Sequence, residues 1–204
     1  MQKQDKYEIK TVNQYGLFEV ASSFQKCVRR GYEKEAMFWA TELAMSNFDN
    51  YLWKRILIIT SEDIGLASPS LMAVIWGLYS SYQVIKKKKD AKHRPERLFL
   101  THAVIALCRA KKSRLVDWTL IANWEGHQDN LLEIPDYAYD KHTLKGKKEG
   151  KGIDHFFDEA SKLNNMLEIE GEAEIKEIAR GYMKEPKKAV PADTSEFPMF
   201  NGDK

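Results

Sequence analysis

Apolar residues recur every three or four positions along most of this 204-residue chain, and this spacing predicts helices. The first predicted helix begins at Leu17 and ends at Gly31, and the second has its apolar face between Ala36 and Ala44. Further helices are predicted over residues 68–89, 95–107 and 114–124. No stretch of useful length alternates between apolar and polar residues, as a strand would. The pattern therefore predicts an all-α fold: a single multi-helix domain with flexible tails.

The predicted centre of this domain is the segment 54–70, in which residues 56–59 are wholly apolar. A helix that is apolar on nearly all sides is a buried one, so we expect the other helices to surround it. The apolar run leads directly into three polar residues, and Gly65 ends the element. We expect Asp-Asn at 49–50 to cap this helix and Ser-Pro at 68–69 to begin the next.

Glu62 and Asp63 are the first candidates for chemistry, because two carboxylates lie where the buried run ends. Catalytic carboxylates must converge on one bond, whereas neighbours on an α-helix point about 100° apart. We therefore prefer a structural interpretation, in which they pair with backbone amides and cations near Gly65. Arg55 lies seven residues before Glu62 on the same face and is expected to share this network. The predicted structural motif comprises Arg55, Ser61, Glu62, Asp63 and Gly65.

Composition narrows the class of protein further. The net charge of +2 gives no general argument for nucleic-acid binding, so any basic patch must be local. Cys27 and Cys108 both lie within apolar helical patterns, and we interpret them as reduced core thiols of a cytoplasmic protein. The polar start is not that of a signal peptide, and the apolar stretches are too short to span a membrane.

The sequence changes character after Gly126. Residues 131–152 contain a proline, three glycines and a cluster of lysines, which predicts an extended segment rich in loops. Short helices are predicted over residues 153–163 and 172–184. We therefore divide the chain into a flexible lead (1–16), a helical domain (17–165) and a polar, proline-broken tail with a possible short helix (166–204).

The glycine-lysine segment is the second candidate site. Glycines let a backbone approach a partner closely, and interleaved lysines suit a phosphate backbone or another anion. The candidate DNA- or anion-binding residues are Lys145, Gly146, Lys147, Lys148, Gly150, Lys151 and Gly152. The alternative is a solvated loop whose lysines contact nothing. The segment is not a Walker A loop, since no Gly-Lys-Ser/Thr sequence is present, and we expect no nucleotide hydrolysis.

The same region contains residue types that bind divalent metals. They are Asp140, His142, Asp154, His155 and Asp158, and their spacing matches no signature that fixes a coordination geometry. We therefore expect no cofactor, and keep a metal site as the alternative. The five tryptophans fall at helical spacings, which favours core packing over stacking on bases.

Five stretches resemble the C-terminal region of the replication-associated recombination ATPases, the MgsA/RarA family of AAA+ proteins related to clamp loaders. They are FQKCVRRG at 24–31, EAMFWA at 35–40, KRIL at 54–57, SEDIGLASP at 61–69 and HAVIALCRAKKS at 102–113. The resemblance continues more weakly through Ile-Pro-Asp at 134–136 and Gly-Lys-Gly at 150–152. It covers roughly residues 18–165.

The resemblance implies an all-helical collar module that follows an AAA+ core and assembles homotetramers acting in DNA replication and repair. This sequence departs from the family in having no nucleotide-binding domain and in its Asp-Lys-His-Thr at 140–143. We hypothesise a non-catalytic assembly module that forms a homo-oligomer and contacts DNA or a separate ATPase. The alternative hypothesis is a metal-dependent enzyme acting on nucleic acid or a phosphoester through residues 140–158.

Overall fold

The computed structural model describes residues 9–87 and 93–185, and these residues form an all-α protein, as predicted. The only β pairing among them is an isolated bridge between Lys10 and Gly16. The chain divides into two compact units, residues 1–131 and 132–204, which are described separately. Within the described ranges, no helix combines the length and the apolar character that crossing a membrane requires.

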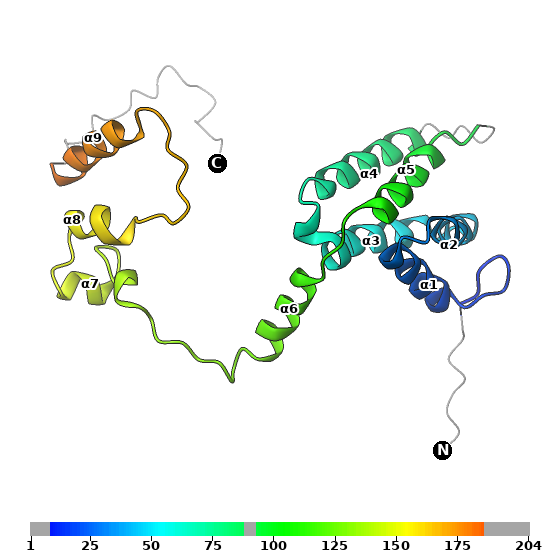
Figure 1. Cartoon of the computed structure of the whole chain (residues 1–204), viewed down its shortest axis with the longest axis horizontal. Coiled ribbons are helices and arrows are strands. Elements are labelled where there is room, and N and C mark those ends of the chain that lie inside the picture. The colour runs from blue at the N-terminus through cyan, green and yellow to red at the C-terminus, as the bar shows by residue number, and fades with distance from the viewer. Residues whose placement is uncertain (1–8, 88–92, 186–204) are drawn as a thin grey trace, which may run out of the picture. The chain divides into compact units, whose positions relative to one another are not determined.

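Five helices form the body of the first unit (Figure 1). They are α1 (Leu17–Arg30), α2 (Glu33–Met45), α3 (Asp49–Ile59), α4 (Leu71–Lys87) and α5 (Arg97–Arg109). Helix α1 packs on α2, and α5 packs on both α2 and α4. Phe24, Leu43, Trp53 and Leu107 are among the side chains that fill the shared core. The bundle therefore buries the apolar faces that the sequence pattern identified.

Glycine 31 ends α1, as predicted. Its φ is +73°, in the left-handed region that glycine adopts without steric cost. The amide of Gly31 donates to the carbonyl of Val28 (3.0 Å), and that of Tyr32 donates to the carbonyl of Cys27 (2.9 Å). Both cysteines on this side of the bundle, Cys27 and Cys108, have free thiols.

Helix α3 is buried on most of its surface but not on all of it. Leu52, Trp53, Ile56 and Ile59 are buried, whereas Ile58 is exposed, so the prediction of burial on nearly all sides is wrong for that side. The predicted cap is also wrong in detail. Asp49 lies inside the first turn, and its carboxylate accepts hydrogen bonds from α4, from the Tyr82 hydroxyl (3.1 Å) and from Lys86.

After α3 the chain winds on without a break into a π-helical turn, η1 (Thr60–Ile64), and a 3-10 turn, η2 (Gly65–Ala67). Residues 68–70 then form a further turn, and α4 begins at Leu71 rather than at Ser68. A π turn fits one residue more than an α turn into the same advance, and such turns often mark functional positions. Here it contains Ser61, Glu62 and Asp63.

The described part of the predicted flexible lead, residues 9–16, forms a tight turn against α2. The Leu17 amide donates to the carbonyl of Ile9 (2.9 Å), which closes the turn. Glu42, which is only 4% exposed, accepts from the backbone amide of Asn13 (3.0 Å) and from its side-chain amide (2.6 Å). The turn is thus fixed by a buried carboxylate. Residues 1–8 lie outside the described part of the chain.

Helix α6 (Leu115–Glu125) belongs to the first unit but lies outside its bundle (Figure 1). It contacts the bundle mainly through η1 and η2, near its own start. Trp118 is 55% exposed and Trp124 is 80% exposed. The prediction that all five tryptophans pack in the core is therefore wrong for these two and for Trp76 on α4, which is also exposed. It is confirmed for Trp53, which is buried, and for Trp39, which packs against the core.

The second unit contains short helices joined by loops. They are the 3-10 turn η3 (Asp136–Ala138), α7 (Leu144–Lys148), α8 (Ile153–His155), the π turn η4 (Phe156–Ala160) and α9 (Glu172–Lys184). Helix α9 matches the predicted exposed helix, and α8 with η4 matches most of the helix predicted over residues 153–163. The proline-broken end of the chain, from Pro186, lies outside the described residues. The domain bounds 17–165 stay a prediction.

Candidate functional site

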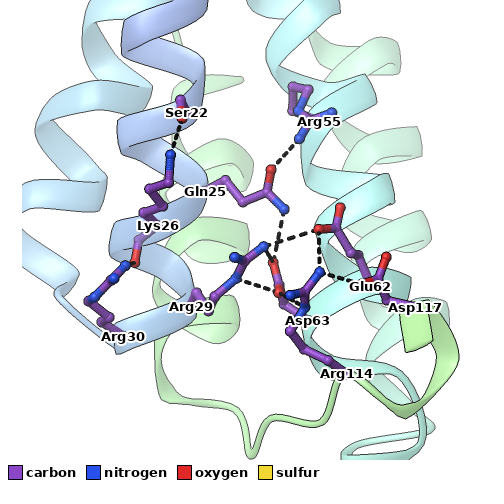
Figure 2. A network of polar contacts seen from close by, with 10 residues as sticks. All are labelled: Ser22, Gln25, Lys26, Arg29, Arg30, Arg55, Glu62, Asp63, Arg114 and Asp117. Carbon is purple, nitrogen blue, oxygen red and sulfur yellow. Dashed lines mark hydrogen bonds and ion pairs between the residues drawn. The ribbon is translucent and has the colours of Figure 1, made fainter. Parts of the chain in front are cut away.

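The π turn η1 brings its two carboxylates together. On an ordinary α-helix, neighbouring side chains would point about 100° apart, and on that ground we expected no convergence. In the wider turn both carboxylates reach one nitrogen of Arg29. Its Nη2 lies 3.0 Å from Oε1 of Glu62 and 3.3 Å from Oδ2 of Asp63 (Figure 2). The two carboxylates therefore meet at one guanidinium, and the expectation that they would not converge is wrong in this respect.

Asp63 is the centre of this network and is almost completely buried, with 1% of its surface exposed. Its carboxylate accepts hydrogen bonds from Nε2 of Gln25 (3.1 Å) and Nε of Arg29 (2.6 Å). A second guanidinium, that of Arg114, lies 3.5 Å from Oδ1. The hydrogen bond to Asp63 raises the pKa of Arg29 above its usual value. A buried carboxylate needs such partners, since an unpaired charge in the interior is costly.

Arg55 joins the same network, although it does not contact Glu62 directly. Its Nη2 donates to the side-chain carbonyl of Gln25, and the amide nitrogen of Gln25 in turn donates to Asp63 (Figure 2). Gln25 therefore links Arg55 to the buried carboxylate of Asp63 through two hydrogen bonds. Ser61, the remaining polar residue of the predicted motif, is exposed.

Gly65 provides the turn that ends η1. Its φ is +46°, which disfavours a side chain, and a Cβ there would lie 3.0 Å from Cγ2 of Val116 on α6. The backbone carbonyl of Asp63 accepts from the amide of Ser113, just before α6 (3.1 Å). The turn is thus the place where α6 meets the bundle.

Sequence reasoning missed three members of this network: Gln25, Arg29 and Arg114. Gln25 and Arg29 are four residues apart in α1, so they lie on one face of the helix, and Gln25 stands among its buried residues. That polar pair was a usable signal. Arg114 is separated from Asp63 by about fifty positions of sequence, and nothing local links the two.

The contacts of this site favour a structural role over a catalytic one. Both carboxylates are paired with guanidinium groups, and Asp63 has almost no surface through which a substrate could reach it. Residues from α1, α3, η1 and the start of α6 meet at this point (Figure 2). The arrangement therefore connects elements that are distant in sequence.

Contacts within the second unit account for several residues of the glycine-lysine segment. The Thr143 hydroxyl caps α7 by accepting from the amide of Gly146 (3.0 Å), and Oδ1 of Asp140 accepts from the amide of His142 (2.9 Å). A Cβ on Gly146 would lie 2.0 Å from the Asp140 carbonyl oxygen, which is sterically impossible without a shift. Gly146 is therefore required by close packing within the unit.

The lysines of this segment fall into two groups. Lys151 is largely covered and donates to the Asp136 carboxylate (2.6 Å), a hydrogen bond that raises the pKa of Lys151. Lys145 lies over the ring of Tyr139, 3.9 Å from its centroid. Lys147 and Lys148 are exposed, as are Gly150 and Gly152. Of the candidate DNA-binding lysines, only this second pair has its ammonium groups uncommitted in the described part of the chain.

The alternative metal ligands are not brought together. Asp154 pairs with Lys184 (2.6 Å), Asp158 pairs with Arg180, and the His142 ring packs edge-on against Phe156. Across residues 9–87 and 93–185, no three His, Cys, Asp or Glu side chains are grouped so as to bind a metal ion. The carboxylates of Asp154 and Asp158 are thus paired with cations of α9.

Comparison with known proteins assigns a family. The family model described as "MgsA AAA+ ATPase C terminal" matches residues 33–184, well over half of the chain. A replication-associated recombination protein A from Bacillus subtilis is 28% identical over 142 residues, which cover 68% of this chain and 32% of that protein. An uncharacterized AAA domain-containing protein from Mycobacterium tuberculosis is 32% identical over 106 residues, which cover 52% of this chain and 22% of that protein.

The match to each relative thus spans a third of its length or less. The matched residues 33–184 include both η1 with its paired carboxylates and the glycine-lysine segment. On this evidence the chain belongs to the family of MgsA AAA+ ATPase C-terminal domains.

Proposed function

We propose that this chain is a non-catalytic assembly module that supports a recombination ATPase in DNA replication or repair. The link to replication and recombination extends the name of the Bacillus subtilis relative to this chain. The 204 residues contain no Walker A sequence, so the proposed role is to hold copies together rather than to hydrolyse nucleotide.

The observation that carries this proposal is the exposed apolar surface of α6. The helix presents large apolar side chains to solvent on several sides although it is attached to the bundle only near its start. They are Leu115, Trp118, Leu120, Ile121 and Trp124. Large apolar side chains exposed together on one helix are typical of an interaction surface, and tryptophans are among the residues that most often dominate binding energy.

We propose a second copy of the chain as the occupant of this surface. Only two residues of α6 are charged, Asp117 and Glu125, and Asp117 is already paired with Arg114. When the same surface of two copies meets about a two-fold axis, a residue near the axis faces its own counterpart, so an unpaired charge there would face a like charge. A nearly uncharged helix avoids this repulsion, so its composition suits self-association. The family resemblance favours four copies.

The first experiment is the mass of the purified chain in solution, measured by light scattering behind a sizing column over a range of concentrations. We expect a multiple of the 23.6 kDa monomer. The double variant Leu120→Ala/Trp124→Ala, which alters one face of α6, should shift the population toward monomer. The matched control is Trp76→Ala/Val84→Ala, which removes exposed apolar side chains from α4.

The control should assemble like the unaltered chain. A monomer at every concentration overturns the proposal, and so does equal loss of assembly in both double variants. Circular dichroism of each variant verifies that its helices are intact.

Within this function we also propose that DNA contacts the exposed lysines of α7. Lys147 and Lys148 are exposed, whereas Lys145 and Lys151 already have partners within the unit. Two free ammonium groups suit neighbouring phosphates.

A further inference from the structure

The connection between the bundle and α6 is hydrogen-bonded along its length. Helix α5 ends at Arg109, and the Lys112 ammonium then donates to the carbonyls of Cys108 (2.8 Å) and Ala110 (2.9 Å). This places a cation at the negative end of α5. Ser113 donates its amide to the Asp63 carbonyl, and its hydroxyl accepts from the amide of Leu115 (3.2 Å). These bonds fix the position of residues 110–114, the root of α6. They do not determine the direction of the helix, which must depend on other contacts.

Arg114 lies between two sets of carboxylates at this root (Figure 2). On the bundle side, its Nη2 is 3.4 Å from Glu62 and its Nε is 3.5 Å from Asp63. On the α6 side, it bonds Asp117, and its guanidinium stacks on the Trp118 ring, 4.2 Å from the centroid. Arg114 thus contacts α6 and η1 at the same time.

The two arginines that share Asp63 do not bind it equally well. Arg29 donates from Nε at 2.6 Å, whereas the Nε of Arg114 is buried at 3.5 Å and has no hydrogen-bond partner among the described residues. Charge-assisted hydrogen bonds are strongest at about 2.7–2.9 Å. The bond from Arg29 to Asp63 is therefore tight, whereas the contact from Arg114 to Asp63 is a looser ionic one that can change without unpacking the core.

We propose that Arg114 sets the direction of α6 relative to the bundle, and through it the geometry in which copies assemble. The residue acts by position: it ties the first turn of α6 to the carboxylates of η1, beside the close contact of Val116 with Gly65. The part of the proposal that concerns assembly rests on the proposed function. The part that concerns the direction of α6 stands on the contacts of a single chain.

The test compares Arg114→Met and Arg114→Lys in the full chain by hydrogen exchange and mass spectrometry. Methionine keeps much of the side-chain length but removes the charge and the donors, and lysine keeps the charge without the planar fork. In Arg114→Met we expect amides of residues 115–125 to exchange about tenfold faster, while those of α1–α3 do not change. Arg114→Lys should restore part of the protection. Arg30→Met, at an exposed arginine of α1, is the matched control.

Light scattering on the same samples provides the second readout. The unaltered chain should give one defined mass, and Arg114→Met should give a spread of masses, because a helix without a fixed direction presents its apolar surface at varied angles. Unchanged exchange in α6 overturns the proposal. Equally faster exchange throughout the first unit also overturns it, because the arginine would then serve general stability only.

The two proposals fail in different ways. If the unaltered chain is a monomer, the assembly function is wrong, and the exchange rates of α6 still decide whether Arg114 fixes its direction. If the chain assembles and Arg114→Met loosens α6 without changing the mass distribution, the direction of α6 does not govern assembly and that part is overturned.

Discussion

Arg29 and Asp63 form a short hydrogen-bonded ion pair, with Nε and Oδ1 2.6 Å apart and the carboxylate buried. The arginine comes from the last turn of α1, and the aspartate comes from the π turn that follows α3. The pair therefore links two elements that are 34 positions apart in sequence. If Arg29 were removed, the buried carboxylate of Asp63 would lose its nearest cation, so breaking this pair should lower the stability of the protein.

Replacing Asp63 by asparagine should reduce the free energy of unfolding by about 3 kcal/mol, as expected when one partner of a buried ion pair is removed. The change keeps the shape of the side chain but leaves Arg29 and Arg114 with less compensating charge. Urea unfolding at pH 7 measures the loss. Glu33→Gln is the control, since it breaks an exposed pair with Arg109, and it should cost far less. Similar losses in both variants would contradict a special role for Asp63.

Replacing Glu42 by glutamine should destabilise the first unit in a pH-dependent manner. Burial alone would raise the pKa of Glu42, but hydrogen bonds from Thr11 and Asn13 outweigh burial and lower it. The carboxylate therefore adds stability above its unfolded pKa of about 4.3, and this contribution is lost as the pH falls through the lower folded pKa.

We expect Glu42→Gln to cost about 1–2 kcal/mol at pH 7, from the weakened hydrogen bonds to the charged group. The difference from the unaltered protein should shrink below about pH 4. Thermal unfolding between pH 3 and pH 7 would detect it. A difference that does not vary with pH would show that the amide and the carboxylate bind the turn at residues 9–16 equally well.

The two thiols should differ in reactivity. Burial raises the pKa of Cys108 to about 11, and the side chain is only 5% exposed. Burial also raises the pKa of Cys27, which is half-buried. At pH 8, iodoacetamide should modify Cys27 slowly and Cys108 only after unfolding in urea, because the thiolate is the reactive form. Peptide mapping by mass spectrometry resolves the two sites, and equal rates in the folded protein would contradict the burial of Cys108.

Substitutions at different lysines of the second unit should affect DNA binding and stability separately. Lys147→Ala/Lys148→Ala should weaken binding to duplex DNA and flatten its salt dependence. The variant would neutralise fewer phosphates, so fewer counterions would be released from the DNA on binding. Fluorescence anisotropy at several salt concentrations measures both effects. Lys151→Ala should instead loosen the unit by removing the bond to Asp136. Unchanged affinity in the double variant would rule out a DNA contact at α7.

The pattern of apolar positions predicted most of the fold because several helix boundaries depend on local chemistry. Gly31 ends α1 through a left-handed backbone that glycine favours, and α9 follows from its own amphipathic spacing. The bounds of α4 and the cap at Asp49 were less accurate. In the case of Asp49, a tertiary contact with Tyr82 and Lys86 determines what the carboxylate binds.

The candidate site was only partly predictable. The spacing identified Arg55, Glu62 and Asp63, but the two carboxylates lie in a π turn, which has no clear signal in local sequence, and they meet at Arg29 of α1. Arg114 joins them from a separate part of the chain. Helix α6 illustrates a second limit, because an apolar helix indicates burial, whereas its apolar side chains are largely exposed in the single chain.

The π turn also determines which sequence changes this region can accept. An α-helix rotates by about 100° and advances 1.5 Å per residue. Deleting Thr60 or Ser61 would therefore shift Glu62 and Asp63 around the helix axis by about that angle, away from Arg29, although both would remain in the sequence. The length of the segment between Ile59 and Gly65 is thus as strongly constrained as its composition. In a set of relatives, insertions or deletions between these two positions should be rare.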